Sequence, residues 1–536
     1  MSDSLPVVGE GPRIVPRLKS DRGGVDYLGL RQVNLDLTAD CIPGINNVTA
    51  HIRPFAVLSW IHWKFHSINV EAERMEARED DLLRFQDKVE VLFTWGHQLN
   101  RLRGVPGLDS RCPPATGRGV ELSFAAWGGR KRQNTSLQAP VQYGPALRPN
   151  DGLGLAAQVM KGLLKVTTAG EALAKALDRR LATSSSYSLL SKLDTTHGRE
   201  ADARELFRLW RVDSPTADER RSFLPVLYDP ESREQPIAIG QRSAMIYAIL
   251  HLLRQARRPL TEEQIRCSLA WMILPGGRAL DFKGNVHSLL LRWRVLQIRQ
   301  AQRSGLEALL AWLEHRLLQE RTRTLSISAL RLDWIKALSD EPLSEGGTGT
   351  CAATMKAFRQ GFDSEESYRA SCARGVADRD MFPLTDQVLA VGYEQPDRVV
   401  PLAVKLLVAA ASWTEWLEED RDLRRDLAHG GIDRVSLSHF AAGFRRFADR
   451  PVSEWLTDVM ERCVISQHMR VATYRFDGRA QRLRFALGEN GLEFYDEKPT
   501  VPQWTQDHLA TLLSLLTDCG LISEDEGLFR HELDSL

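Results

Sequence analysis

The stretch Asp36–Glu71 constrains the fold of this chain more than any other part of the sequence. It opens with Pro43-Gly44, a pair typical of a turn, because proline fixes φ and glycine tolerates a positive φ. Apolar residues then recur at helical spacing, and two of them are tryptophans, which bury a large area. These residues are Val48, Ile52, Phe55, Trp60 and Trp63. Since Pro54 interrupts the run, we expect a short helix, a kink and a second helix from Phe55 onward.

Arg53 lies within this apolar run, and its charge has two interpretations. In a functional role, it would reach a phosphate or a carboxylate from a rigid helix. In a structural role, it would pair with Asp36 or Asp40 and fix the N-terminal loop. We favour the structural role. We also expect His62 and His66 to be structural, since a zinc protease needs glutamate directly after the first histidine.

The same stretch carries a family resemblance. The pattern that Pro43, Gly44, Thr49, Arg53, Phe55, Leu58 and Trp60 form resembles the N-terminal signature of an uncharacterised bacterial family. The family is encoded in phage-defence islands, beside helicase and phospholipase-D-like nuclease genes. The resemblance covers residues 36–71, with a further echo in the C-terminal region. It implies other subunits of a defence system as partners, a helicase or a nuclease among them, and it carries over no catalytic residue.

Length and composition limit the classes of protein that this chain can belong to. A chain of 536 residues is too long for one hydrophobic core, so several domains are expected. Its seven cysteines are scattered without a CxxC pair, which favours a reducing compartment over a disulfide framework or a zinc site. The longest apolar run, Val399–Trp413, is interrupted by Lys405 and is shorter than a membrane span. The N-terminus has no signal-peptide pattern, so we expect a cytoplasmic protein without membrane association. We also expect no metal and no cofactor.

The pattern of helical periodicity predicts a mainly α, multidomain protein with small winged-helix-like α/β segments. One such segment ends in a strand followed by Thr167-x-x-Gly170, where the threonine would cap a helix. Another would use strands at 473–476 and 482–485 and a helix at 499–521. The predicted organisation is an extended N-terminal arm (1–35), a helical domain with a winged-helix-like segment (36–182), a basic helical domain (183–340), a loop-rich linker (341–397) and a C-terminal helical domain with a small α/β cap (398–536).

Charge is distributed unevenly along a chain whose net charge is zero. Residues 241–332 contain 15 Lys and Arg against 6 Asp and Glu, whereas residues 333–422 contain 9 against 17. Such a split indicates either a face that binds a polyanion or two regions that dock on each other. The candidate nucleic-acid-binding residues are Arg292, Arg299 and Arg303 in one helical stripe, and Arg130, Lys131 and Arg132 in a glycine-led loop.

Three functions remain open at the level of sequence. The first is a non-enzymatic component of a bacterial anti-phage defence or DNA-processing complex, which contacts partner proteins and DNA. The second is a cryptic metal-dependent nuclease, with Asp477, Asp496 and Lys498 as its candidate residues. The third is a scaffold or sensor without a nucleic-acid role, in which the acidic region covers the arginine stripe. We favour the first, since no complete catalytic motif is present.

Overall fold

The computed structural model of the protein is mostly helical, with a few short strands, which confirms the predicted mainly α class. The described residues are 26–71, 79–106, 119–127, 136–140, 142–149, 152–160, 163–339, 349–359, 364–373, 380–391, 396–476 and 483–532. The predicted basic loop with Arg130, Lys131 and Arg132 lies outside them, as does Asp477.

The chain divides into two compact units, and each unit is assembled from separate stretches of sequence. Unit 1 comprises Met1–Val33, Ile298–Glu365 and Ala377–Trp504, and unit 2 comprises Asn34–Gln297, Glu366–Val376 and Thr505–Leu536. The predicted organisation used contiguous segments only, and its boundaries stay a prediction. Residues 26–30 belong to unit 1, where Leu28 and Leu30 are buried, so this end of the predicted arm is part of a packed core.

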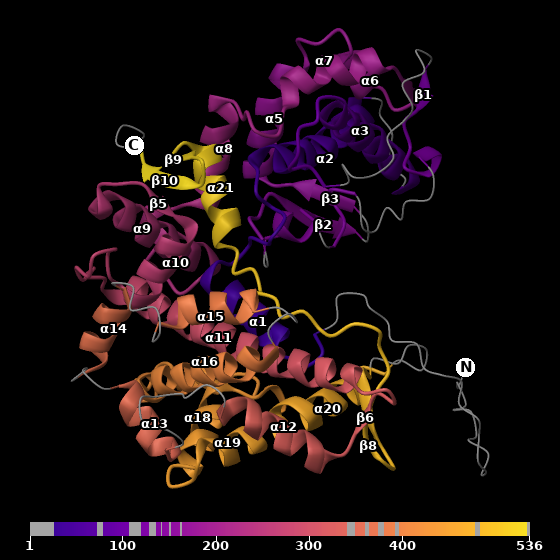
Figure 1. Ribbon diagram of the computed structural model, residues 1–536. Helices are drawn as coiled ribbons and strands as arrows, with labels where there is room; N and C mark the ends of the chain where they lie inside the picture. Colours follow the sequence, from indigo (N-terminus) through magenta and orange to yellow (C-terminus); the bar gives the residue numbers. More distant parts are fainter. Residues whose placement is uncertain are drawn as a thin grey trace. The chain divides into compact units, whose positions relative to one another are not determined.

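The first part of unit 2 is a helical assembly centred on α2. Its helices are α1 (Arg31–Cys41, beginning in unit 1), α2 (Ile52–Glu71), α3 (Glu79–Leu99), α5 (Thr168–Leu181), α6 (Tyr187–Ser191), α7 (Glu200–Trp210) and α8 (Ala217–Leu227). Helix α2 packs against α3, α5 and α8 (Figure 1). Pro54 lies in the first turn of α2, where its missing N–H has no helical partner to lose, so the predicted kink is wrong.

Two antiparallel strand pairs complete this part of unit 2. Strand β1 (Val120–Glu121) pairs with β4 (His197–Gly198), and β2 (Ala156–Met160) pairs with β3 (Leu163–Val166). The Thr167 hydroxyl accepts a hydrogen bond from the Gly170 amide and caps α5, as predicted. Short 3₁₀ turns lie at η1 (Ala125–Trp127), η2 (Pro145–Leu147) and η3 (Pro230–Ser232).

The second part of unit 2 joins residues from the middle and the end of the chain. Its elements are α9 (Ala238–Ala256), β5 (Leu260–Thr261), α10 (Glu262–Trp271), α14 (Glu365–Ala373), α21 (Leu509–Cys519), β9 (Ile522–Asp525) and β10 (Leu528–His531). The strands form an antiparallel sheet of order β5-β10-β9, in which Leu528 pairs with Thr261. Helix α9 contacts α10 and β10, and α21 contacts α10 and β9. Thr261 and Gln264 form a capping box at the start of α10.

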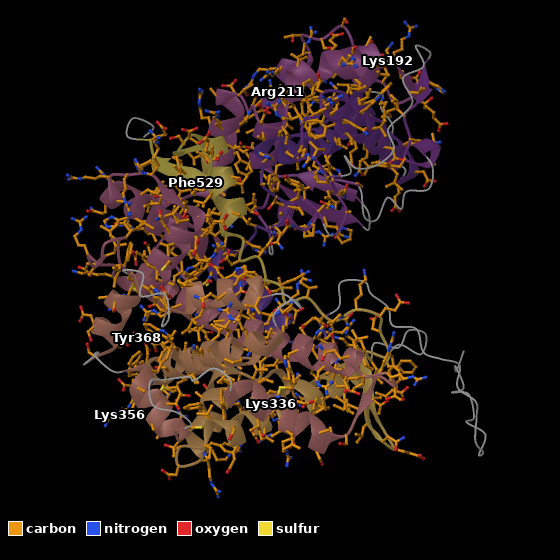
Figure 2. All side chains as sticks on the ribbon, in the orientation of Figure 1. Lys192, Arg211, Lys336, Lys356, Tyr368 and Phe529 are labelled. Atoms are coloured by element: carbon orange, nitrogen blue, oxygen red, sulfur yellow. The ribbon has the colours of Figure 1, made fainter. Side chains whose placement is uncertain are left out.

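Unit 1 is built around the apolar helix α16. Its helices are α11 (Gly284–Gln319, in unit 1 from Ile298), α12 (Ile327–Ser339), α13 (Cys351–Phe358), α15 (Met381–Ala390), α16 (Pro396–Leu417), α17 (Arg424–Leu427), η4 (Ile432–Arg434), α18 (Leu437–Arg446), α19 (Val452–Asp458), η5 (Val459–Ser466) and α20 (Gln467–Tyr474). Helix α16 contacts α15, α18, α12 and α13 (Figure 1). Side chains fill the space between these helices, while Lys336 of α12 and Lys356 of α13 are exposed (Figure 2).

Helix α16 also bears on the question of membrane association. Among the described residues, Arg398–Leu417 is the one helix long and apolar enough to cross a membrane, and 83% of that apolar window is buried inside the protein. Burial of this extent is typical of a core helix. The cytoplasmic location stays a prediction.

One expectation for unit 1 is corrected by the structure. A sheet of order β6-β8-β7 contains β6 (Thr324–Leu325), β7 (Phe485–Gly488) and β8 (Gly491–Phe494), but residues 473 and 474, predicted as strand, belong to α20. Helix α11 continues through Gly305 without a break. A Cβ atom there would lie 2.8 Å from the Leu407 side chain, so this glycine permits close packing of α16.

Candidate functional site

The motif around Arg53 is structural. The Arg53 guanidinium lies 3.0 Å from the Glu219 carboxylate and donates hydrogen bonds to the carbonyls of Leu209 (2.8 Å) and Ser214 (2.7 Å). Both charged side chains are fully buried, and burial lowers the pKa of Arg53 to about 10. The expected structural role fits this geometry, but the partner is Glu219 rather than Asp36 or Asp40. Glu219 also completes the capping box of α8 with Thr216, so one carboxylate joins two helices.

Pro43, Gly44 and Trp60 also serve the fold of unit 2. The Arg242 guanidinium donates to the Pro43 carbonyl at 2.7 Å. Gly44 has a φ of +82°, and a Cβ atom there would lie 2.8 Å from the Gly152 carbonyl oxygen. The Trp60 indole donates to the Asp178 carboxylate at 2.8 Å.

Two of the three arginines in the predicted stripe do not lie on the protein surface. Arg299 is buried and donates to the carbonyls of Arg434 and Val435, and burial lowers its pKa to about 9. Arg303 is buried beside Glu307, with 2.7 Å between Arg303 Nε and Glu307 Oε1. These two side chains are out of reach of a nucleic-acid backbone, which corrects their assignment as DNA-contacting residues. Arg292 is half-buried on the unit 2 part of α11.

One residue of the nuclease alternative, Asp496, belongs to a buried ion cluster, whereas the Lys498 side chain is exposed. Arg484 donates to Glu314 Oε2 at 2.9 Å and to Asp496 Oδ2 at 2.8 Å, and to the Lys498 carbonyl. Burial raises the pKa of Glu314, while the guanidinium opposes that shift. Asp496 is therefore occupied by an arginine, and within the described ranges no group of three or more His, Cys, Asp and Glu side chains is placed to hold a metal ion.

A pocket in unit 1 that the sequence did not indicate has the chemistry of a binding site. Its volume is about 560 Å³, within the size class of small-ligand pockets. Helix α18, the π-helix η5 and the first turn of α20 line it, together with η4. Three arginines lie around it: Arg446, Arg462 and Arg470.

The floor of this arginine-rimmed pocket is apolar and rigid. Phe440 and Trp455 are buried, and their ring centroids lie 5.8 Å apart in an edge-on arrangement. Phe444 also packs edge-on against Trp455, with ring centroids 4.8 Å apart. Gly443 of α18 keeps the pocket open, since a Cβ atom there would meet no other atom within 4 Å.

The charged rim is organised by one carboxylate. Asp458 lies 3.4 Å from the Arg446 guanidinium and 3.5 Å from that of Arg462, so both pairs are long and half-exposed. Arg470 is held more firmly, because it pairs with Asp433 and donates to that residue's carbonyl at 2.6 Å. Arg446 and Arg462 are thus the cations best placed to exchange Asp458 for an incoming anion.

The π-helix aligns the pocket residues along one side of a continuous helical segment. In an α-helix, a step of four residues overshoots one turn by about 40°. A π-helix has more residues per turn, so the same step falls short of a turn. Because residues 459–466 are π-helical, Asp458, Arg462, Ser466 and Arg470 stay on the pocket side. π-helical turns are frequent at functional sites.

The pocket has the features of a binding site rather than those of a nucleophilic centre. Burial raises the pKa of the Cys463 thiol to about 12, so the thiol is protonated at neutral pH and is not an activated nucleophile. Asp458 is the one carboxylate among the described lining residues, and His439, which also lines the pocket, has its Nδ1 2.7 Å from the Ser436 hydroxyl. Two or more guanidinium groups above an aromatic floor suit a phosphate attached to an aromatic ring system.

Sequence reasoning missed the pocket because Arg446 lies on a different helix from Arg462 and Arg470. The series Arg462, Ser466, Arg470 at steps of four is the signal that was available.

Comparison with known proteins gives no family for this chain: no protein-family model matches it, and no curated protein or solved structure is significantly similar to it.

Proposed function

We propose that this chain is a non-enzymatic nucleic-acid-binding component of a bacterial anti-phage defence or DNA-processing complex, and that unit 1 binds the nucleic-acid phosphate in its arginine-rimmed pocket. The observation that carries this proposal is the pair Arg446 and Arg462, which share Asp458 through long, half-exposed ion pairs. A phosphate offers more acceptor oxygens to two guanidinium groups than Asp458 does. The defence role rests on the resemblance of residues 36–71.

The proposal is tested by fluorescence anisotropy of labelled DNA at several salt concentrations. Arg446→Gln and Arg462→Gln together are expected to weaken binding and to reduce the slope of log K against log salt by about 1 to 2. Asp458→Asn is expected to tighten binding, because it removes the competing carboxylate.

Arg445→Gln is the matched control for Arg446→Gln. Arg445 directly precedes Arg446 in α18, and its side chain is 46% exposed against 56% for Arg446. It pairs with Glu418 and does not line the pocket. Its removal should leave the salt slope unchanged. A folded Arg446→Gln/Arg462→Gln variant with the wild-type slope would refute the proposal.

A second candidate function, contact with a partner protein, is favoured by the second part of unit 2. The order α9, β5, α10, α21, β9, β10, with β5 beside β10, is that of a winged helix interrupted between α10 and α21. We propose this segment as a winged-helix-like one. In DNA-binding members, the third helix enters the major groove. Here that helix, α21, is largely buried, and the hairpin tip carries the exposed acids Glu524, Asp525 and Glu526.

An acidic tip and a covered third helix do not suit a DNA backbone, so this segment would contact protein. Glu524→Gln with Asp525→Asn is then expected to leave DNA affinity and its salt slope as in wild type. A clear gain in DNA affinity would show that the hairpin faces the phosphates instead. The nuclease alternative is less favoured, because Asp496 is paired with Arg484.

A further inference from the structure

We infer that the nucleic acid bound by unit 1 is single-stranded, with its backbone on Arg446 and Arg462 and a base stacked on the ring of Tyr474. This inference rests on the proposed function and names its substrate class. It starts from an exposed aromatic side chain that the fold does not use: Tyr474 is 87% exposed at the end of α20. An exposed aromatic ring has a free face on which a nucleic-acid base can stack.

Tyr474 continues the line of pocket residues. It follows Arg470 by four residues on α20, so the two side chains share a helix face and lie about 6 Å apart along the axis. Ile432, which lines the pocket and whose carbonyl accepts from Arg470, is exposed as well. Arg470 therefore has an exposed apolar residue and an exposed aromatic residue as its neighbours. Phe476, two residues further on, is also exposed.

The dimensions of the pocket favour a single strand over a duplex. A cavity of about 560 Å³ accepts one nucleotide, whereas a duplex presents paired bases in grooves that are themselves about 6 to 12 Å wide. Guanidinium groups beside aromatic side chains are the usual means of holding single strands without reading sequence.

Charge is consistent with modest, salt-sensitive binding at this site. Arg446, Arg462 and Arg470 face the carboxylates of Asp458 and Asp433, which leaves one positive charge in excess. A single strand of several nucleotides supplies stacking energy in addition to phosphate contacts, and stacking does not depend on this excess. Affinity would therefore be divided between the arginines and the aromatic ring.

The test compares four 12-nucleotide probes by fluorescence anisotropy with the full-length protein: single-stranded DNA, single-stranded RNA, the DNA duplex and a DNA strand of abasic sites. The single strands are expected to bind more tightly than the duplex and the abasic strand. Tyr474→Ala should weaken single-strand binding about 5- to 100-fold, while Tyr474→Phe keeps the ring and should bind as wild type. The tighter of the DNA and RNA single strands identifies the natural class.

The abasic strand isolates the stacking contribution, since it keeps the phosphates and removes the bases. Tyr474→Ala is expected to leave its affinity unchanged. Filling the pocket with Gly443→Phe should also weaken single-strand binding, whereas Gly443→Ala, which adds one methyl group in open space, should not. Circular dichroism checks that each variant folds.

The outcomes separate this inference from the proposed function. If the duplex binds as tightly as the single strands and Tyr474→Ala equals wild type, while Arg446→Gln/Arg462→Gln still lowers affinity, the single-strand inference is overturned and the phosphate site stands. If the arginine variant has no effect on any probe, the phosphate site itself falls.

Discussion

Replacing Arg53 by methionine should destabilise unit 2 severely. Methionine keeps an unbranched side chain of similar length but leaves the Glu219 carboxylate without its cation in a fully buried position. It also removes the donors to the carbonyls of Leu209 and Ser214. Breaking a buried pair by removing one partner costs about 3–5 kcal/mol. For a unit of about 300 residues this corresponds to a fall in Tm of roughly 5–8 °C.

Thermal unfolding followed by circular dichroism measures this fall, with Arg179→Met as the matched control. Arg179 pairs with Asp218 next to Glu219 in sequence, but it is 62% exposed, so its loss should cost less than about 1 kcal/mol. The double variant Arg53→Met/Glu219→Gln removes both charges while glutamine can still serve the capping box. It should recover much of the lost stability.

Two results would refute this reasoning. If Arg53→Met unfolds at the same temperature as Arg179→Met, the buried pair does not contribute as argued. If the double variant is no more stable than Arg53→Met, the cost lies in the unpaired carbonyls rather than in the orphaned carboxylate. A stable Arg53→Met protein that has lost nucleic-acid binding would restore the functional interpretation of Arg53.

Further predictions concern acid stability and one turn. Burial lowers the pKa of His97 and of His468 to about 4, below the value of about 6.5 in an unfolded chain. Between these pH values the unfolded chain binds more protons than the folded one. The free energy of unfolding therefore falls as the pH falls. Each histidine should lower the free energy of unfolding by about 2 kcal/mol between pH 7 and pH 5, measured by urea unfolding. His468→Gln should reduce this pH dependence. A wild-type protein equally stable at both pH values would contradict the prediction. Gly44→Ala should destabilise by about 1–3 kcal/mol, from a positive φ and a clash. Gly527→Ala, with a φ of +79° and open space in the same unit, should show the φ cost alone; equal melting temperatures would exclude the clash.

The acid prediction follows from a shared arrangement in the two units. His97 Nδ1 lies 2.7 Å from the Phe93 carbonyl and its Nε2 accepts from the Val212 amide. His468 Nδ1 lies 3.3 Å from the Tyr27 carbonyl and its Nε2 accepts from the Arg484 amide. In each case one ring nitrogen donates and the other accepts, which requires the neutral imidazole. Protonation would place an N–H against an N–H.

Sequence reasoning succeeded where the information is local. The cap of α5 at Thr167 is set by residues within a few positions of one another. It failed at Arg299 because the carbonyls that hold this side chain belong to Arg434 and Val435, far along the chain. From sequence alone, an arginine at helical spacing is expected to be exposed, because its distant partner is not known.

The candidate site could be predicted only in part for the same reason. The helix that carries Arg462 and Arg470 follows from periodicity, but its π-helical segment does not, since local propensity does not distinguish the two hydrogen-bond patterns. The convergence of Arg446 with Arg462 depends on the packing of α18 beside this helix. Only the tertiary structure supplies that.

The discontinuous composition of unit 2 has a consequence for how the protein is made. The amide of Ile52, at the start of α2, donates to Asp518, and Arg266 pairs with Asp507, so early parts of this unit wait for the last part of the chain. A ribosome releases the N-terminal residues first, and these cannot complete their core until synthesis ends. Helix α2 can pack on α3, α5 and α8 once residue 227 has been made. Its contact with α21 and the pairing of Arg266 with Asp507 form only after residues 505–532 have been made, so the second part of unit 2 is the part that needs protection from aggregation during translation.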